Sequence, residues 1–259
     1  MGTEVWGICM ARNEADIIGP VVAHMATQVD HVLVADNLST DDTAALAAAA
    51  GAEVVRDDDP AYRQSEKMTA LAHRALAAGA TWVVPFDADE VWVSPFGRMG
   101  DVLAGLGVQV AHADLYDHVP TSLDDDGITD PTRRMGWRRR MPGGLPKVAC
   151  RAADDLTIDQ GNHGARYADI DIPTTVTGQL VVRHFPYRTR EQFVAKAKQG
   201  AAALALTSLP RSSGAHWREY GLIAERDGDD ALADVFTKWF YSPDPHCDPG
   251  LIYDPAPVA

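Results

Sequence analysis

Two carboxylates separated by a single residue follow an apolar run in the first third of the chain. Asp87 and Asp89 belong to the segment Phe86-Asp87-Ala88-Asp89-Glu90, which closes the apolar residues 82–86. Carboxylates at positions i and i+2 of a loop can converge on one divalent cation, and with diphosphate oxygens they suit Mg²⁺ or Mn²⁺. Such a cation would act as a Lewis acid on a leaving diphosphate. An acidic turn is the simpler interpretation, but the position at a strand end favours the metal site.

Two further polar segments also follow apolar runs. Ala11-Arg12-Asn13-Glu14 comes after residues 5–10, and Asp36-Asn37 comes after residues 32–35. Asp36 or Asn37 could hydrogen-bond a nucleotide base or ribose, although the residues that follow are also suited to cap a helix. The segment that ends at Glu14 could equally be a capping loop.

The order of these runs predicts an α/β fold. Apolar runs suited to buried strands alternate with stretches whose apolar residues recur at helical spacing. This order indicates a mostly parallel sheet with helices on both faces. Ligands of such sheets bind beyond the carboxyl ends of the strands, where the three polar segments fall. The expected strands are 5–10, 32–35, 53–55 and 82–86, and the expected helices are 18–25, 43–50 and 68–76.

The second half of the sequence is less regular. Residues 119–145 are polar and rich in Asp, Arg, Gly and Pro, which predicts a long loop. The tail from Ser242 is rich in proline and is expected to form an extended arm. We find no domain boundary, so residues 1–259 are predicted to form a single domain. Further strands are expected at 108–116, 147–151 and 180–184, and helices at 193–204 and 232–240.

Composition narrows the class of protein. The 259 residues include 23 Lys and Arg against 37 Asp and Glu, which gives a net charge of −14. This charge argues against a nucleic-acid-binding protein or one that lies on anionic lipid. The three cysteines are far apart, so no disulfide framework is expected. No signal peptide and no apolar stretch of about 18 residues are found, so we expect a cytoplasmic protein without an integral membrane segment.

The three polar segments together resemble the family 2 glycosyltransferases of the GT-A fold. The order and spacing agree over about residues 5–92, which would be the nucleotide-binding half, with about 93–259 as the acceptor half and C-terminal helices. The segment His184-Phe185-Pro186-Tyr187-Arg188-Thr189-Arg190-Glu191-Gln192-Phe193, with Lys196, also looks like a subgroup of these enzymes. The resemblance implies inverting transfer of a sugar from a nucleoside-diphosphate sugar, with a UDP-sugar favoured, to a small molecule or a glycan.

The resemblance also implies roles for individual residues. Asp89 would be the main ligand of Mn²⁺ or Mg²⁺, Asp87 would lie near the ribose or the metal, and His184 would join them from the C-terminal half. Where the family usually has a second Asp, this chain has Asn37, which leaves the base preference open. The residues assigned to the nucleotide sugar are Arg12, Glu14, Asp36, Asn37, Asp87 and Lys147.

The catalytic base is harder to assign. An inverting transfer needs a base that takes the proton of the acceptor hydroxyl. The Glu-Asp pair usual in the family is missing, and Asp159 and His163 are equal candidates, with Asp154-Asp155 behind them. The basic cluster at 133–140 could be a lid that clamps the diphosphate or a solvated loop.

The sequence is also compatible with two other functions. Asp87 and Asp89 also match the first motif of haloacid dehalogenase-like phosphatases, in which Asp87 would be the nucleophile and Asp89 the acid. Three βα units precede the motif, whereas that family usually starts with it. Because the usual base motif is missing, the chain could also bind a nucleotide sugar without turning it over.

Overall fold

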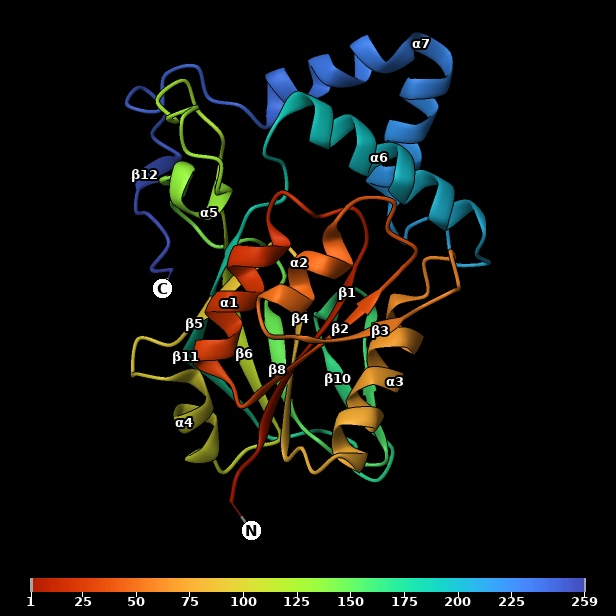
Figure 1. Cartoon of the computed structure of the whole chain (residues 1–259), viewed down its shortest axis with the longest axis vertical. Coiled ribbons are helices and arrows are strands. Elements are labelled where there is room, and N and C mark those ends of the chain that lie inside the picture. The colour runs from red at the N-terminus through yellow and green to blue at the C-terminus, as the bar shows by residue number, and fades with distance from the viewer. Residues whose placement is uncertain (1, 259) are drawn as a thin grey trace.

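A computed structural model describes residues 2–258 and centres on an eight-stranded sheet (Figure 1). Across the sheet the strands follow the order β3-β2-β1-β4-β8-β6-β11-β5. Their bounds are β1 (Val5–Ala11), β2 (His31–Asp36), β3 (Glu53–Arg56), β4 (Trp82–Asp87), β5 (Glu90–Val93), β6 (Val110–Asp117), β8 (Lys147–Arg151) and β11 (Thr175–His184).

Strands β1 to β4 run parallel, as the sequence predicts. Successive residues of a strand pack on opposite faces of the sheet. Val84 packs in the same cluster as Met25 of α1, whereas Val83 packs with Met68 of α3. Helices on both faces therefore bury most positions of the inner strands β1, β2 and β4, which is why they appear as continuous apolar runs. The connecting helices are α1 (Ile18–Gln28), α2 (Thr43–Ala49) and α3 (Gln64–Ala77).

The other half of the sheet is mixed. β8 lies antiparallel between β4 and β6, β6 pairs in parallel with β11, and β5 pairs antiparallel with β11. The predicted class is confirmed as an α/β fold with a mostly parallel sheet flanked by helices and a more irregular C-terminal half. This is the architecture that the GT-A resemblance implies.

The segment expected to be a long loop contains regular elements. α5 (Pro131–Arg134) and β7 (Trp137–Arg139) interrupt it, and β7 pairs with β12 (Leu251–Tyr253) in the proline-rich tail. The tail is thus held against the body as part of a two-stranded sheet. The remaining elements are α4 (Met99–Ala104), β9 (Leu156–Ile158), the 3-10 turn Gln160–Asn162 and β10 (Ala165–Tyr167).

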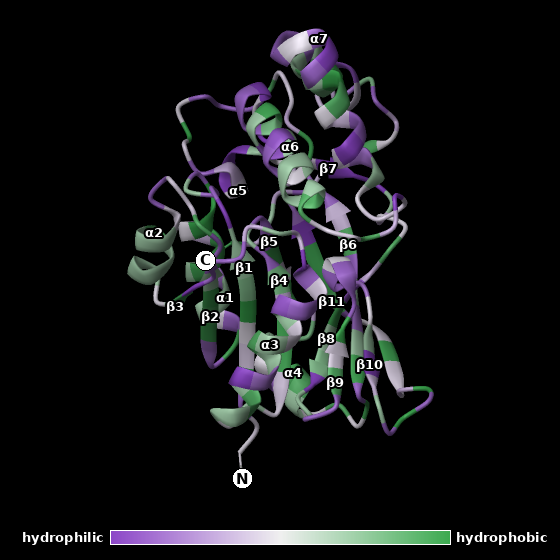
Figure 2. Cartoon of the chain, turned by 90° about the vertical axis from the view of Figure 1, so that its right-hand side faces the viewer, coloured by the Kyte–Doolittle hydropathy of each residue, from purple (hydrophilic) through white to green (hydrophobic). Residues whose placement is uncertain are grey.

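A helical hairpin covers one end of the sheet. α6 (Arg190–Ala205) and α7 (Ala215–Trp239) lie together at the top of Figure 1 and enclose a small core of their own. In Figure 2 the hydrophobic colour is concentrated on the central strands, whereas α7 carries many hydrophilic residues. Among residues 2–258, no helix is both long enough and apolar enough to cross a membrane.

The topology gathers polar residues at the edge of the sheet beneath this hairpin. Asp36, Asp87, Asp117 and His184 are the last residues of β2, β4, β6 and β11. Glu90 starts β5 opposite His184, because β5 runs antiparallel to β11. The sheet therefore brings residues that are up to about 150 positions apart to one edge.

Candidate functional site

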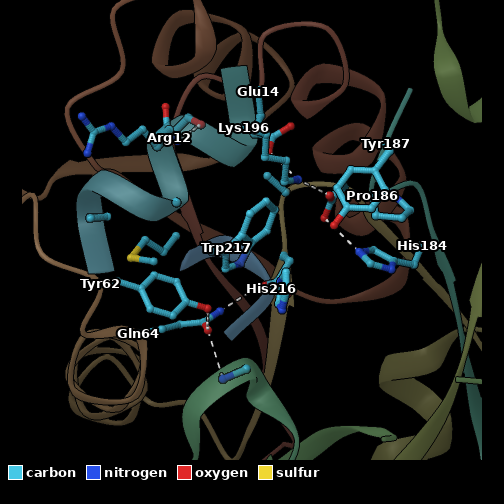
Figure 3. Close-up of a pocket in the computed structure, with 18 of the residues that line it drawn as sticks. Arg12, Glu14, Tyr62, Gln64, His184, Pro186, Tyr187, Lys196, His216 and Trp217 are labelled. Atoms are coloured by element: carbon cyan, nitrogen blue, oxygen red, sulfur yellow. Dashed lines mark hydrogen bonds and ion pairs between the residues drawn. The ribbon is translucent and has the colours of Figure 1, made fainter. Parts of the chain in front are cut away.

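A cavity of about 550 Å³ lies between this edge and the helical hairpin (Figure 3). Figure 3 shows Arg12 on one side of it, His184, Pro186 and Tyr187 on the other, and Trp217 between them. Of the residues expected in a site, those that line the cavity are Arg12, Glu14, Asn37, Asp87, Asp89, Lys147, His163 and His184.

Asp89 is the most tightly enclosed carboxylate of the cavity. Only 2% of it is exposed, and its Oδ2 lies 2.5 Å from the Nζ of Lys196. Lys196 Nζ also lies 2.9 Å from Glu14 Oε1, so one cation joins two strand ends. Burial alone would raise the pKa of Asp89, but the charges of Lys196, His184 and Arg188 hold it well below its ordinary value. Asp89 is therefore ionised at neutral pH.

A buried arginine fixes Glu14. Arg188 is 2% exposed, and its Nη2 lies 2.5 Å from Glu14 Oε2 and 2.8 Å from Asp16 Oδ1. It also donates to the backbone oxygen of Phe185 at 3.0 Å. Because Glu14 is held by Arg188 on one oxygen and by Lys196 on the other, its carboxylate is fixed at the end of β1.

His184 is oriented as a metal ligand would be. Its Nδ1 lies 2.7 Å from Asp117 Oδ1, so Nδ1 carries the hydrogen that the carboxylate accepts and Nε2 points toward Asp89. A ligand histidine usually donates its second N–H to a carboxylate in this way. Burial would lower the pKa of His184, but the charge of Asp89 and the hydrogen bond to Asp117 raise it to about 8.

The distance between His184 Nε2 and Asp89 Oδ1 is also compatible with a shared metal ion. His184 Nε2 lies 3.7 Å from Asp89 Oδ1, which is within the roughly 4.2 Å that two atoms bound to one ion at about 2.1 Å can span. Within residues 2–258 no three His, Cys, Asp or Glu side chains already form a cluster that could hold a metal ion. Asp89 and His184 thus fit an ion whose remaining ligands come from a diphosphate and water.

Asp87 faces inward and is held by three donors. Its Oδ2 lies 2.6 Å from Lys147 Nζ, and its Oδ1 accepts from Gln64 Nε2 at 2.9 Å and Asn162 Nδ2 at 3.1 Å. A carboxylate offers about four lone-pair sites, so roughly one remains for a ligand. This leaves room for a single further contact from Asp87.

Lys147 lines the cavity, but its ammonium group is bound by other residues of the chain. It is 3% exposed, and its Nζ lies 2.8 Å from Glu90 Oε1 and donates to the Gly161 oxygen at 2.9 Å, besides its pair with Asp87. Burial alone would lower the pKa of Lys147, but the charges of Asp87 and Glu90 raise it above its ordinary value. All three of its N–H donors are therefore committed within the protein.

The structure separates the two candidate bases. His163 lines the cavity, and its Nδ1 donates to the Pro146 oxygen at 2.9 Å, which leaves the Nε2 lone pair free. Burial, helped by the charge of Lys147, lowers the pKa of His163. Asp159 does not line the cavity. Its side chain is 38% exposed, and its Oδ1 lies 2.7 Å from Arg166 Nε.

Asn37, elsewhere in the cavity lining, is anchored by the loop that follows β3. Its Nδ2 donates to Asp57 Oδ2 at 2.8 Å and to the Asp59 oxygen at 2.6 Å. This network directs the amide hydrogens away and leaves the Oδ1 acceptor for the cavity. Asp36 does not line the cavity.

The basic cluster contacts the tail. Arg138 Nη2 lies 2.6 Å from Asp254 Oδ2, and Arg140 donates to the backbone oxygens of Pro249 and Leu251 at 3.2 Å. Neither arginine lines the cavity. These contacts give the cluster a structural role in holding the C-terminal segment.

The site includes residues that had no predicted role. Arg188 and Lys196 belong to a segment that shares the resemblance, but their carboxylate partners lie 99 to 182 positions away in the sequence. Asp117 ends a strand in the irregular half, where the only signal was its place after an apolar run. The additional residues are Glu90, Asp117, Asn162, Arg188 and Lys196.

No protein-family model matches the chain. Among curated proteins, a TPR repeat-containing protein of Synechococcus elongatus is 34% identical over 85 residues. The match covers 32% of this chain and 20% of the relative, so the chain spans about a fifth of that protein's length.

Several solved structures are similar in part. Mannosyl-3-phosphoglycerate synthase from Rubrobacter xylanophilus is 26% identical over 49% of this chain and 44% of its own, with a TM-score of 0.35. Glucosyl-3-phosphoglycerate synthase from Mycobacterium tuberculosis is 27% identical over 44% of each chain, with a TM-score of 0.33. A mycobacterial protein is 21% identical over 81% of this chain and 76% of its own, with a TM-score of 0.41. At these TM-scores the functional assignment has to rest on the cavity itself.

Proposed function

We propose that the protein transfers a sugar, with inversion, from a nucleoside-diphosphate sugar to an acceptor hydroxyl and uses a divalent metal. The observation that carries the proposal is the alignment of Asp117, His184 and Asp89. A carboxylate that orients a histidine toward a second, ionised carboxylate is the pattern of a metal site with open positions. This pair lies in the same cavity as Glu14 and Asn37, at the ends of parallel strands, where ligands of such sheets bind.

The donor would lie across the ends of β1, β2 and β4. The side-chain oxygen of Asn37 can accept a hydrogen bond from a nucleotide base. Arg12 also lines the cavity and forms no ion pair with any other described residue. The last lone pair of Asp87 suits a ribose hydroxyl. About 1–92 would then form the nucleotide half, and about 93–259 the acceptor half.

Asp89 and His184 would hold the metal, which would supply positive charge to offset the negative charge of a leaving diphosphate. Lys196, whose Nζ pairs with both Glu14 and Asp89, holds the two carboxylates in place beside the metal position. Arg188 keeps Glu14 and Asp89 in position from the buried side.

We assign the base to His163. In the transfer the acceptor oxygen forms a bond to the anomeric carbon while the bond to the diphosphate oxygen breaks and the diphosphate leaves with its electron pair. The acceptor proton goes to Nε2 of His163, because Nδ1 already donates to the Pro146 oxygen. The lowered pKa keeps the imidazole neutral near pH 7, as a base requires.

The same contacts disfavour a phosphatase. In that alternative Asp89 would have to donate a proton, yet Lys196 and Arg188 keep it ionised. A non-catalytic nucleotide-sugar-binding protein would be distinguished by the absence of slow donor hydrolysis.

The identity of the nucleotide stays a prediction, with UDP first. The glucosyl-3-phosphoglycerate synthase structures hold UDP or UDP-glucose with Mn²⁺ or Mg²⁺. Titration calorimetry of UDP, GDP, dTDP and CDP, each with and without Mn²⁺, tests the donor half. We expect one nucleotide to bind in a Mn²⁺-dependent manner, and Asp89→Asn to remove that dependence.

The matched control is Asp101→Asn, because Asp101 is an exposed acidic residue away from the cavity. This variant should bind as the wild type does. If none of the four nucleotides binds with Mn²⁺ present, the proposal is wrong, and trapping of a phosphoryl group on Asp87 becomes the next experiment.

A further inference from the structure

The distribution of charge in the cavity indicates what the acceptor can be. Three lining residues carry a permanent positive charge: Arg12, Lys147 and Lys196. Lys147 is enclosed by Asp87 and Glu90, and Lys196 by Glu14 and Asp89, so each of the two lysines is already neutralised by two carboxylates. In Figure 3 Arg12 lies on the side opposite His184 and Tyr187, with Trp217 between them.

The wall around His163 has a different character. The apolar and glycine residues that line the cavity include Leu115, Gly143, Gly144, Leu145, Pro186 and Tyr187. Lys147 lies near His163, but its charge is already paired with Asp87 and Glu90. The Gly143 amide donates to the Leu115 oxygen at 2.8 Å, which fixes this glycine-containing loop against the end of β6. Leu145 is 60% exposed and presents an apolar surface at the rim.

Asp117 adds a negative charge on the side of His184, whose imidazole is itself paired with Asp89 and Asp117. Asp117 lines the cavity, and its side chain is 41% exposed. Its Oδ1 is used by His184, whereas Oδ2 has no partner among residues 2–258. A carboxylate with a free oxygen can accept from a sugar hydroxyl, and it repels a phosphate or carboxylate at close range.

Aromatic faces complete the surface. Tyr187 is held edge-on by Phe193, with ring centroids 4.9 Å apart, and Trp217 lies against Gly200, where a side chain would reach within 2.9 Å of the indole. Flat rings fixed in this way suit the apolar face of a pyranose or an aryl group.

We propose that the acceptor is an uncharged hydroxyl compound with an apolar or aromatic face, such as a glycoside, and not a phosphorylated or carboxylated small molecule. This inference rests on the proposed function and specifies its acceptor class. An anionic acceptor would need a free cation near His163, but Lys147 and His184 are each already paired with two carboxylates.

The test compares acceptors in the presence of Mn²⁺ and the donor identified by calorimetry. The panel pairs neutral methyl and 4-nitrophenyl glycosides with glycerol phosphate, phosphoglycerate and sugar phosphates. Each compound is scored by product formation and by suppression of donor hydrolysis. We expect neutral glycosides to suppress hydrolysis and form product, with kcat/KM at least 100-fold above that of any anionic acceptor.

A charge introduced at the rim sharpens the test. Leu145→Lys should shift the ratio of kcat/KM for anionic over neutral acceptors at least 10-fold toward the anions. Leu123→Lys is the matched control, because Leu123 is 55% exposed and lies outside the cavity, and it should leave the ratio unchanged.

The outcomes separate the two proposals. If the donor is hydrolysed but an anionic compound is used as well as the neutral ones, or no neutral compound suppresses hydrolysis, the acceptor inference is wrong while the transferase stands. If no nucleotide binds with Mn²⁺ and no donor is hydrolysed, the proposed function itself fails.

Discussion

At the scale of single residues, Asp117 is the position that best distinguishes a metal site from a plain ion-pair network. It touches His184 Nδ1 and would touch no metal itself. Removing such a partner usually costs 10–100-fold in metal affinity. We therefore expect Asp117→Ala to weaken Mn²⁺-dependent nucleotide binding by about this factor, with Asp117→Asn in between, as measured by calorimetry. Binding without Mn²⁺ should not change, and an equal loss in both conditions would contradict the metal role.

His163 can be tested through the pH dependence of transfer. A base must be unprotonated, so kcat/KM should fall as the pH drops through its pKa. Because burial holds the pKa of His163 below 6.5, the acidic limb of the profile should lie below pH 6.5. A limb near pH 4 would indicate a carboxylate such as Asp159 instead. His163→Gln should abolish transfer, while Asp159→Asn should keep the wild-type profile.

At the scale of elements, His118 joins the end of β6 to the segment before β7. It is 2% exposed, its Nδ1 donates to the Met135 oxygen at 2.7 Å, and its ring stacks on Phe185 at 4.3 Å. Burial lowers the pKa of His118 to about 3, and Nε2 has no partner among the described residues. Protonation would thus create a buried N–H without an acceptor.

This makes stability dependent on pH. The unfolded chain binds the proton below an ordinary pKa of 6.5, whereas the folded chain does not until about 3. Stability should therefore fall as the pH drops below 6.5, by about 2 kcal/mol at pH 5 from this group. Urea unfolding at pH 7.5 and 5 measures it: His118→Gln should reduce the difference, and His31→Gln, at an exposed histidine, should not. An unchanged difference in His118→Gln would refute the assignment.

The elements also show what could be predicted from sequence. β1, β2 and β4 were predictable because inner strands covered on both faces are almost entirely apolar, whereas β3 is an edge strand with Glu53 and Arg56 exposed. The motif at Asp87 follows from its place at a strand end. β11 begins at Thr175 with polar and glycine residues, and its pairing with β6 depends on contacts some 65 positions away. The pairs of Arg188 and Lys196 with β1 and Asp89 depend in the same way on tertiary packing, which no local pattern encodes.

At the scale of the whole molecule, the sheet and the helical hairpin have separate cores that share one cavity. Phe193 is fully buried among Tyr187, Tyr220, Phe236 and Phe240 in the hairpin, whereas the sheet residues belong to other clusters. α6 nevertheless supplies Lys196 to the ends of β1 and β4. Loosening the hairpin should therefore disturb ligand binding before it disturbs the sheet.

Phe193→Ala tests this division. Truncating a buried Phe costs about 3–5 kcal/mol, and here the loss should fall on the hairpin as a local opening. Hydrogen exchange should become faster in residues 190–239 and stay slow in β1, β2 and β4, while Mn²⁺-dependent nucleotide binding weakens because Lys196 is no longer held. Leu222→Ala, at a position on α7 that is 65% exposed, should change neither. Equal acceleration in hairpin and sheet would mean that the two cores unfold as one cooperative unit, and the hairpin could then not respond to ligand independently of the sheet.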